Sequence, residues 1–159
     1  MKVNGKLVRG IIFDLDGVII STDEYHYLAW KAIADKEGIE FNREINNRLR
    51  GISRMESLNI ILEKASREYS EEEKQTLAAE KQEIYRKSLA KLSYKSLSKD
   101  VVKTIKKLYE QGYHLGIGSS SKNTKYILER LNIENAFDYV VDGNMISHSK
   151  PDPEVFLKA

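Results

Sequence analysis

The sequence contains no cysteine, and both of its prolines lie among the last nine residues. The absence of cysteine excludes disulfides, zinc–thiolate sites and thiol chemistry. No apolar run approaches the roughly 18 residues that a membrane-spanning helix needs, and the first ten residues are too polar for a signal peptide. The 26 basic and 24 acidic side chains leave a formal charge of +2, which is too small for a nucleic-acid-binding surface. We therefore expect a soluble cytoplasmic protein with no nucleic-acid or membrane partner.

The composition is that of a globular protein, because 41% of the 159 residues are hydrophobic and 31% are charged. Residues 10–13 are a continuous apolar run between turn residues, which is typical of a strand buried on both faces. From Thr22 to Leu92 nearly all of the sequence has helical spacing, and capping boxes begin at Ser53 and Ser70. Four further elements are then predicted, alternately helix and strand, at residues 98–112, 113–118, 122–131 and 136–141.

This order of elements predicts an α/β fold, in which a helical segment interrupts a Rossmann-like parallel sheet after its first strand. We expect a discontinuous core formed by residues 1–20 and 95–159, and a helical cap domain formed by residues 21–94. The sequence contains no internal repeat and no low-complexity linker between these two parts.

Two aspartates, Asp14 and Asp16, follow directly after the first predicted strand. If the extended geometry continues, a period of two places both carboxylates on one face, at the sheet edge where open parallel sheets bind ligands. Two close carboxylates repel each other, which raises the pKa of one and attracts a divalent cation. One carboxylate can then act as a nucleophile while the other exchanges a proton. The alternative interpretation is a polar turn that only ends the strand.

Three serines, Ser119, Ser120 and Ser121, follow the second core strand and precede a predicted helix. Hydroxyls and backbone N–H groups at a helix N-terminus can hold a phosphate, although serines are also common helix caps. Lys150 lies in a loop that two prolines keep extended, where its ammonium can neutralise phosphoryl oxygens. The alternative for this lysine is a solvated surface group.

These three motifs, in this order and at strand ends, resemble the haloacid dehalogenase superfamily of phosphoryl-transfer enzymes. The first motif of the superfamily is similar to Phe13-Asp14-Leu15-Asp16-Gly17-Val18, the second to Ser119 after Gly116-Ile117-Gly118, and the third to Lys150. From about Val8 to Phe156 the chain also resembles the β-phosphoglucomutase branch of that superfamily. The further matches are Glu24-Tyr25-His26, Ala29-Trp30-Lys31-Ala32, Leu49-Arg50-Gly51-Ile52-Ser53-Arg54, Ser57-Leu58, Ser121-Lys122-Asn123, Leu128-Glu129-Arg130 and Ser149-Lys150-Pro151.

The resemblance implies roles for individual residues. Asp14 is then the nucleophile that forms an aspartyl-phosphate, and Asp16 is the general acid and base. Mg²⁺ is then bound by Asp14 and by the backbone carbonyl of Asp16, while Ser119 and Lys150 bind the transferring phosphoryl group. The resemblance also implies the following contacts with a sugar phosphate: His26, Trp30, Leu49, Gly51, Ile52, Arg54, Ser57, Lys81, Ser121, Lys122 and Asn123. Within this set Arg54 would grip the non-reacting phosphate through a bidentate contact, and for Trp30 plain core packing is an equal alternative.

Two features depart from the pattern of the superfamily. Ser21 stands where this group usually has aspartate, at the expected hinge between core and cap. The fourth motif of the superfamily, a pair of acidic residues that completes the Mg²⁺ site, does not follow Lys150 within the sequence. We therefore expect that the chain is truncated and lacks the last core strands, that it binds Mg²⁺ weakly, and that it tends to associate. The intact protein is expected to be a monomer.

The leading hypothesis is phosphoryl transfer on a sugar phosphate through an aspartyl-phosphate, converting β-glucose 1-phosphate to glucose 6-phosphate. One alternative is a sugar-phosphate phosphatase of the same superfamily, in which water attacks the aspartyl-phosphate. The other alternative is a catalytically impaired fragment that binds sugar phosphates.

Overall fold

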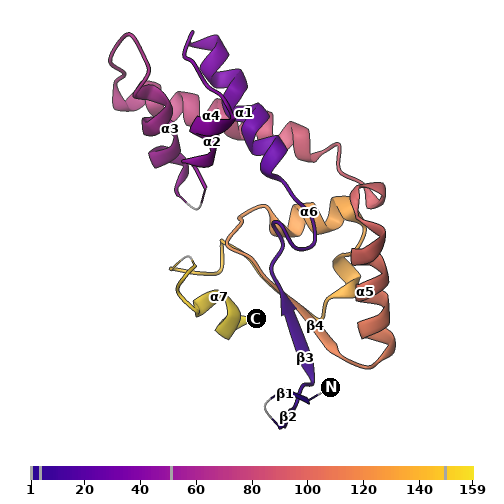
Figure 1. Cartoon of the computed structure of the whole chain (residues 1–159). Coiled ribbons are helices and arrows are strands. Elements are labelled where there is room, and N and C mark those ends of the chain that lie inside the picture. The colour runs from indigo at the N-terminus through magenta and orange to yellow at the C-terminus, as the bar shows by residue number, and fades with distance from the viewer. Residues whose placement is uncertain (1, 4, 51, 149) are drawn as a thin grey trace. The chain divides into compact units, whose positions relative to one another are not determined.

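A computed structural model describes residues 2–3, 5–50, 52–148 and 150–159 of the chain. The backbone divides into two compact units, which are coloured along the chain in Figure 1. The core unit comprises Met1–Thr22 and Lys91–Ala159, and the helical unit comprises Asp23–Ala90. The helical unit is therefore one continuous segment inserted into the sequence of the core unit. Within the described ranges, no helix is long and apolar enough to span a bilayer.

A parallel sheet of three strands organises the core unit. Its strand order is β3–β4–β5, with bounds β3 (Gly10–Phe13), β4 (His114–Gly118) and β5 (Tyr139–Val141). Phe13 is paired with Ile117, and Gly118 is paired with Val141. Because all three strands run in the same direction, their carboxyl ends meet at one edge of the sheet. This topology confirms the predicted α/β fold. A short hairpin, which the sequence pattern did not predict, precedes the sheet and consists of β1 (Lys2–Val3) and β2 (Lys6–Leu7).

Helices flank both faces of this sheet. Figure 1 shows α5 and α7 on opposite sides of the β3–β4 pair. The helical elements of the core unit are η1 (Tyr94–Ser96), α5 (Lys99–Glu110), α6 (Thr124–Leu131), η2 (Glu134–Ala136) and α7 (Glu154–Lys158). Apolar side chains of the strands and helices pack between them, including fully buried Ile117, Val141, Ile127, Leu131 and Val155. Burial of these side chains is the main force that holds the sheet against its helices.

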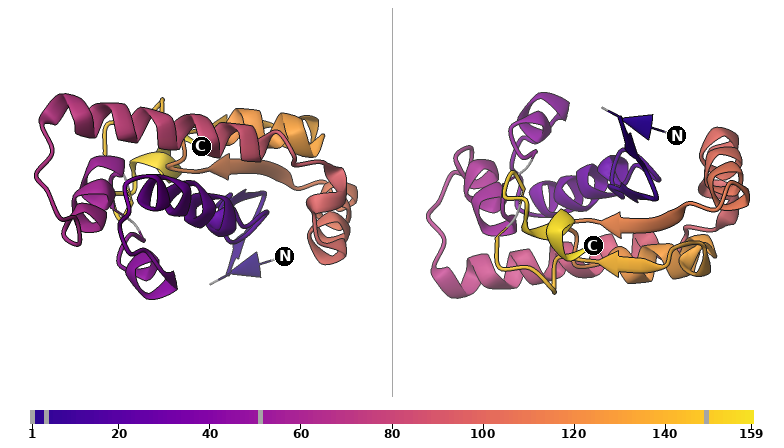
Figure 2. Two further views of the ribbon diagram at one scale, coloured as in Figure 1. Left: turned by 90° about the horizontal axis from the view of Figure 1, so that it is seen from above. Right: turned by 90° about the horizontal axis from the view of Figure 1, so that it is seen from below.

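Within the described residues the helical unit contains four helices. Their bounds are α1 (Asp23–Lys36), α2 (Arg43–Asn47), α3 (Arg54–Leu62) and α4 (Glu71–Leu89). Side-chain caps begin three of them, α2, α3 and α4. Both capping boxes expected from the sequence are present, at Ser53 before α3 and at Ser70 before α4. Helices α1 and α4 lie side by side, as the left view of Figure 2 shows. The apolar core of this unit includes Trp30, Ile33, Leu58, Ile61 and Leu77.

A glycine holds two loops of the core unit in contact. Gly143 lies in the turn after β5, and its N–H donates to the carbonyl oxygen of Ser121 at 3.1 Å. A Cβ atom at position 143 would lie only 2.2 Å from the carbonyl oxygen of Ser120. Because that oxygen belongs to the backbone, it cannot rotate out of the way. The close approach therefore requires glycine, and it fixes the backbone that follows β4.

We predict that Gly143→Ala destabilises the chain, because one of the two loops must move to admit the methyl group. The free energy of unfolding should fall by about 1–3 kcal/mol, measured by urea denaturation followed by circular dichroism. Gly116→Ala is the matched control, since a Cβ there would lie 3.5 Å from its nearest neighbour, an ordinary contact. It should change the same free energy by less than about 1 kcal/mol. Equal effects of the two substitutions would contradict this account of Gly143.

Candidate active site

The turn after β3 carries the two predicted carboxylates. Leu15 is fully buried, whereas Asp14 and Asp16 on either side of it are half-buried. Gly17 then adopts a positive φ of 78°, a conformation that glycine adopts without steric cost. Its N–H donates to the carbonyl oxygen of Ile20 at 2.9 Å. The chain therefore turns sharply as soon as it has presented both carboxylates at the edge of the sheet.

Each of the two carboxylates has a different partner. The ammonium of Lys150 lies 2.8 Å from Oδ1 of Asp14, and the backbone N–H of Leu15 donates to the same oxygen at 2.8 Å. The hydroxyl of Thr22 donates to Oδ1 of Asp16 at 2.5 Å. Asp14 is thus oriented by a cation and an N–H group, while a neutral hydroxyl orients Asp16. The two carboxylates differ in their electrostatic surroundings, which is a requirement for two different chemical roles.

The loop after β4 is ordered by hydrogen bonds of its own serines. Ser119 is 1% exposed, and its backbone N–H donates to the carbonyl oxygen of Val141 at 3.0 Å. Its Oγ accepts the N–H of Ser121 at 3.1 Å, and Oγ of Ser121 accepts the N–H of Asn123 at 3.2 Å. This chain of bonds leads from the end of β4 directly into the N-terminus of α6. The helix dipole there favours an anion.

The hydroxyl of Ser120 is buried and has no hydrogen-bond partner within the described part of the chain. Lys122 is exposed on the same loop. An unsatisfied buried hydroxyl costs free energy, and a bound oxyanion is one group that could accept its proton. The loop therefore has the donors expected of an anion site.

The loop that carries Lys150 is held by Glu154 at the start of α7. The carboxylate of Glu154 accepts the backbone N–H of His148 at 2.8 Å and that of Ser147 at 3.0 Å. The ammonium of Lys158 lies 2.5 Å from Oε1 of Glu154. Lys158 and these backbone bonds lower the pKa of Glu154 to about 2, so the carboxylate remains charged over the ordinary pH range. Ser149, which belongs to the predicted lysine motif, lies outside the described residues.

The residues at this edge of the sheet suit Mg²⁺ in type but are few. Mg²⁺ prefers oxygen ligands and commonly takes one or two carboxylates together with phosphate and water. Asp14 supplies one such carboxylate, and the expected second oxygen is the backbone carbonyl of Asp16. Among the described residues, no group of three or more acidic or imidazole side chains is arranged to hold a metal ion. The donor set therefore fits a weakly held Mg²⁺ that shares its coordination with a phosphate.

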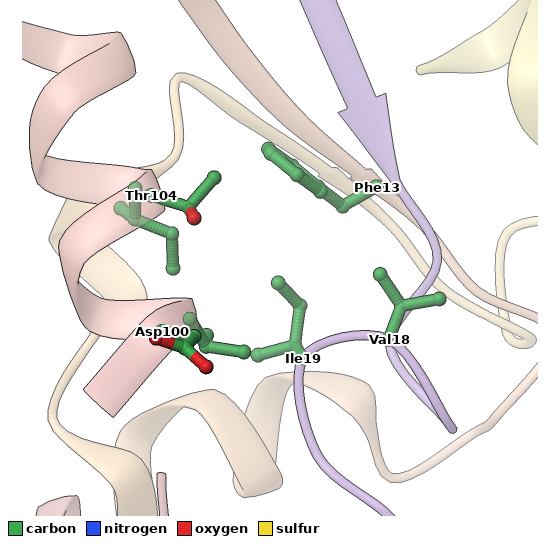
Figure 3. Close-up of a pocket in the computed structure, with 7 residues that line it drawn as sticks. Phe13, Val18, Ile19, Asp100 and Thr104 are labelled. Atoms are coloured by element: carbon green, nitrogen blue, oxygen red, sulfur yellow. The ribbon is translucent and has the colours of Figure 1, made fainter. Parts of the chain in front are cut away.

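An apolar cavity of about 230 Å³ lies beside the same turn. Figure 3 shows Phe13, Val18 and Ile19 on one side of it and Asp100 and Thr104 of α5 on the other. The cavity is completed by Val101 and Ile105. None of the predicted catalytic side chains lines it. The predicted chemistry therefore belongs to the edge of the sheet and not to this cavity.

The helical unit contains a buried cluster around Lys81. This side chain is 3% exposed, and its amine lies 2.9 Å from Nδ1 of His26. The amine also lies 5.0 Å from the ring centre of Trp30 and 4.8 Å from that of Tyr85. The imidazole of His26 stacks on Tyr85 with the ring centres 4.1 Å apart. The structure thus brings together three residues that the sequence assigned to substrate binding, with Tyr85 as a fourth member.

Burial favours the uncharged forms of the Lys81 amine and the His26 imidazole. Burial lowers the pKa of Lys81 to about 7, and the positive charge of Arg54 contributes in the same direction. Burial also lowers the pKa of His26 to about 3, with a further contribution from Lys81. His26 is therefore neutral at physiological pH, and Lys81 exchanges its proton close to neutrality.

The other predicted residues of the helical unit have varied surroundings. Arg54 is the exposed first residue of α3. Ser57 is 4% exposed, and its hydroxyl donates to the carbonyl oxygen of Ser53 at 2.9 Å. Leu49 packs against the apolar core of the unit, while Ile52 is 38% exposed. Gly51 lies outside the described residues.

Three residues that contact the candidate groups were missed as site residues by the sequence analysis. Thr22 was considered only as the start of the helical segment, although its hydroxyl donates to Asp16. Tyr85 and Phe156 contact His26 and Lys150 through their rings. Only Thr22 had a usable signal, since it lies close to the two aspartates in sequence. The aromatic contacts depend on packing that no local pattern reveals.

The chain is similar to known proteins along nearly its whole length. The family profile described as haloacid dehalogenase-like hydrolase matches residues 11–159. A β-phosphoglucomutase of Bacillus subtilis is 42% identical over 154 residues, covering 96% of this chain and 68% of the relative. A fructose-1-phosphate phosphatase of Escherichia coli is 29% identical, covering 93% of this chain and 76% of the relative. A crystal structure of β-phosphoglucomutase from Clostridium difficile has a TM-score of 0.79 at 38% identity, covering 95% and 69% of the two chains.

The depressed pKa of Lys81 predicts how stability depends on pH. Below pH 7 the amine is charged in both the folded and unfolded chain, so folding bears the full cost of burying the charge. Between about 7 and 10.5 only the unfolded chain is protonated, and the cost shrinks as pH rises. Lys81→Met should therefore raise the free energy of unfolding by a few kcal/mol near pH 6 and by much less near pH 10.

Urea denaturation at these two pH values measures the effect. Lys87→Met is the matched control on α4, because the side chain of Lys87 is 75% exposed, and it should have little effect at either pH. A gain for Lys81→Met that is the same at both pH values would show that removal of the buried charge is not its cause.

Proposed function

The chain belongs to the haloacid dehalogenase-like hydrolase family of phosphoryl-transfer enzymes, and from this premise we propose that it acts on a sugar phosphate through an aspartyl-phosphate. The preferred reaction is the conversion of β-glucose 1-phosphate to glucose 6-phosphate. The observation that carries this proposal is the pairing of Asp14 with Lys150 at the carboxyl edge of the parallel sheet. The 42% identity with a β-phosphoglucomutase supports the choice of reaction.

We assign the nucleophile to Asp14. One of its carboxylate oxygens attacks the phosphorus atom of the phosphoryl donor, and the bond from phosphorus to the leaving oxygen breaks with its electron pair. Asp16 gives its proton to that leaving oxygen and later takes the proton from the attacking sugar hydroxyl. The hydroxyl of Thr22, 2.5 Å from Asp16, orients this second carboxylate. In the second half-reaction the sugar hydroxyl attacks the phosphorus atom of the aspartyl-phosphate, and the bond from phosphorus to the Asp14 oxygen breaks, which regenerates the Asp14 carboxylate.

Ser119 and Lys150 are proposed to bind the transferring phosphoryl group. Such a transfer needs positioning and charge neutralisation more than covalent assistance. Lys150 supplies one positive charge, and the N-terminus of α6 supplies a partial one. The buried hydroxyl of Ser120 is available as a further donor. Ser121, Lys122 and Asn123 would contact the sugar phosphate from the same loop.

We propose that the helical unit is the cap domain of the enzyme. Arg54 would bind the phosphate that does not react. Ser57 would support helix α3, which carries Arg54, and Leu49 would support the loop before that helix. His26 and Lys81, with Trp30 beneath the amine, would contact the sugar. Their lowered pKa values keep His26 neutral and leave Lys81 only partly charged near pH 7, which suits a neutral sugar ring. Ile52 and Gly51 are assigned to contacts with the sugar phosphate by resemblance alone.

Mg²⁺ is proposed to bind to the carboxylate of Asp14 and to the backbone carbonyl of Asp16. When bound, it neutralises charge on the phosphoryl oxygens and on the nucleophile. Lys150 alone compensates part of the charge of Asp14, since it already forms an ion pair with that carboxylate. Lys150, together with Mg²⁺ when bound, would reduce the repulsion between the Asp14 carboxylate and the phosphate.

A phosphatase is the second candidate, and the similarity to a fructose-1-phosphate phosphatase favours it. In that reaction water replaces the sugar hydroxyl as the group that attacks the aspartyl-phosphate. The nucleophile and the phosphate donors keep the same roles. The two functions therefore differ only in the acceptor of the phosphoryl group.

We predict that this chain binds Mg²⁺ weakly and through Asp14. Titration calorimetry should show low affinity that inorganic phosphate increases, because phosphate completes the oxygen ligands. Asp14→Asn should remove the binding, while Asp35→Asn, an exposed substitution on α1, should leave it unchanged. Tight binding that survives Asp14→Asn would place the metal elsewhere.

A coupled assay tests the reaction itself. With β-glucose 1-phosphate, a trace of the bisphosphate and Mg²⁺, the chain should form glucose 6-phosphate, detected with glucose-6-phosphate dehydrogenase. Asp14→Asn should lower the rate by on the order of a thousandfold or more, and Asp35→Asn should have no effect. Release of free phosphate without glucose 6-phosphate would replace the mutase by the phosphatase.

A further inference from the structure

Lys150 has a second partner besides Asp14. Its ammonium lies 4.8 Å from the ring centre of Phe156 in α7, within the distance at which an aromatic face attracts a cation. The side chain of Lys150 is 28% exposed, so water shields this contact only in part. The ammonium therefore lies between a carboxylate and an aromatic face.

The Phe156 ring also packs against the strand that leads to Ser119. A Cβ atom at Gly118 would lie 3.1 Å from Cδ1 of Phe156 and 3.3 Å from Cγ2 of Ile12. These distances are shorter than ordinary carbon contacts. Gly118 therefore leaves the space that the ring occupies. Through this contact α7 is packed directly against the end of β4, one residue before Ser119.

The backbone of α7 holds the ring in place. Val155 is fully buried beside it, and the N–H of Phe156 donates to the carbonyl oxygen of Pro153 at 3.0 Å. The carboxylate of Glu154 binds the N–H groups of Ser147 and His148. Helix α7, which carries this 41%-exposed ring, is thus bonded to both sides of the loop that carries Lys150.

We propose that Phe156 is a positioning residue, whose ring face holds the Lys150 ammonium where it meets the phosphoryl group. This inference rests on the proposed function. Its physical reason is that the charge of Asp14 changes during the reaction, since an aspartyl-phosphate no longer offers a free carboxylate to the lysine. An aromatic ring attracts the cation equally in both states, and it neither takes its proton nor neutralises its charge. Lys150 is then held while its anionic partner is exchanged.

Fluorinated phenylalanines at position 156 test this directly. Successive fluorine atoms weaken the attraction of the ring for a cation and change its shape only slightly. The dissociation constant for inorganic phosphate, measured by calorimetry in the presence of Mg²⁺, should rise stepwise to about threefold for the trifluorinated ring. Phe156→Leu and Gly118→Ala should weaken binding by a similar factor, while Phe156→Trp should restore it to within about twofold of wild type.

Two controls separate positioning from folding. Tyr139→Leu replaces an aromatic side chain that is 52% exposed on β5, and it should leave phosphate affinity unchanged. Unfolding midpoints of the fluorinated chains should match wild type, so that a graded loss of affinity cannot come from instability. A flat response across the fluorinated series, or no phosphate binding by the wild-type chain, would overturn the positioning role.

Phosphoryl transfer to Asp14 is measured on the same preparations, which separates this inference from the proposed function. Labelling of Asp14 with a flat fluorine series would overturn the inference and leave the function standing. A graded series without labelling would overturn the function, and Phe156 would still position Lys150 for an anion.

Discussion

The ion pair between Asp14 and Lys150 is the interaction on which the candidate active site depends. It joins the end of the first core strand to a loop near the end of the chain, at 2.8 Å. The parallel pairing of β3 with β4 and of β4 with β5 makes this contact possible, because it brings the residues after each strand to one edge. The pair also sets the electrostatics of the edge, since two carboxylates follow β3 and a single lysine offsets part of their charge. The carboxylate of Asp16, for which we propose proton exchange, accepts the hydroxyl of Thr22.

Much of this edge could be predicted from the sequence, because its signals are local. An apolar run followed by Asp14 and Asp16 marks the end of a strand, but the expectation that both faces of this strand are buried was wrong, since Ile12 in β3 is 40% exposed. The serines before α6 predict an anion site. The fold class followed from the order of helices and strands. The short helix α2 lies within the segment that was predicted as helical, but it was not predicted as a separate element, since its five residues are too few to show a period. The contacts of Phe156 and Gly118 were not predicted either, because they join segments far apart in sequence through packing alone.

The helical unit shows the same division between local and tertiary information. Its capping boxes at Ser53 and Ser70 could be predicted from the sequence because their hydrogen bonds form within four residues. The environment of Lys81 could not be predicted from the sequence, since His26, Trp30 and Tyr85 contact it from different turns of two helices. Desolvation is the main physical reason for the low pKa of this buried lysine, and the positive charge of Arg54 adds to it. Resemblance identified this lysine, and only the structure explains its chemistry.

The central claim is that Asp14 receives the phosphoryl group, and trapping the covalent intermediate tests it most directly. The chain is incubated with β-glucose 1,6-bisphosphate and Mg²⁺, treated with borohydride, and digested for mass spectrometry. Borohydride reduces an aspartyl-phosphate to homoserine, so the account predicts homoserine at position 14 and an unmodified aspartate at position 16. Homoserine at position 16, or unmodified aspartate at both positions while the bisphosphate is consumed, would contradict it.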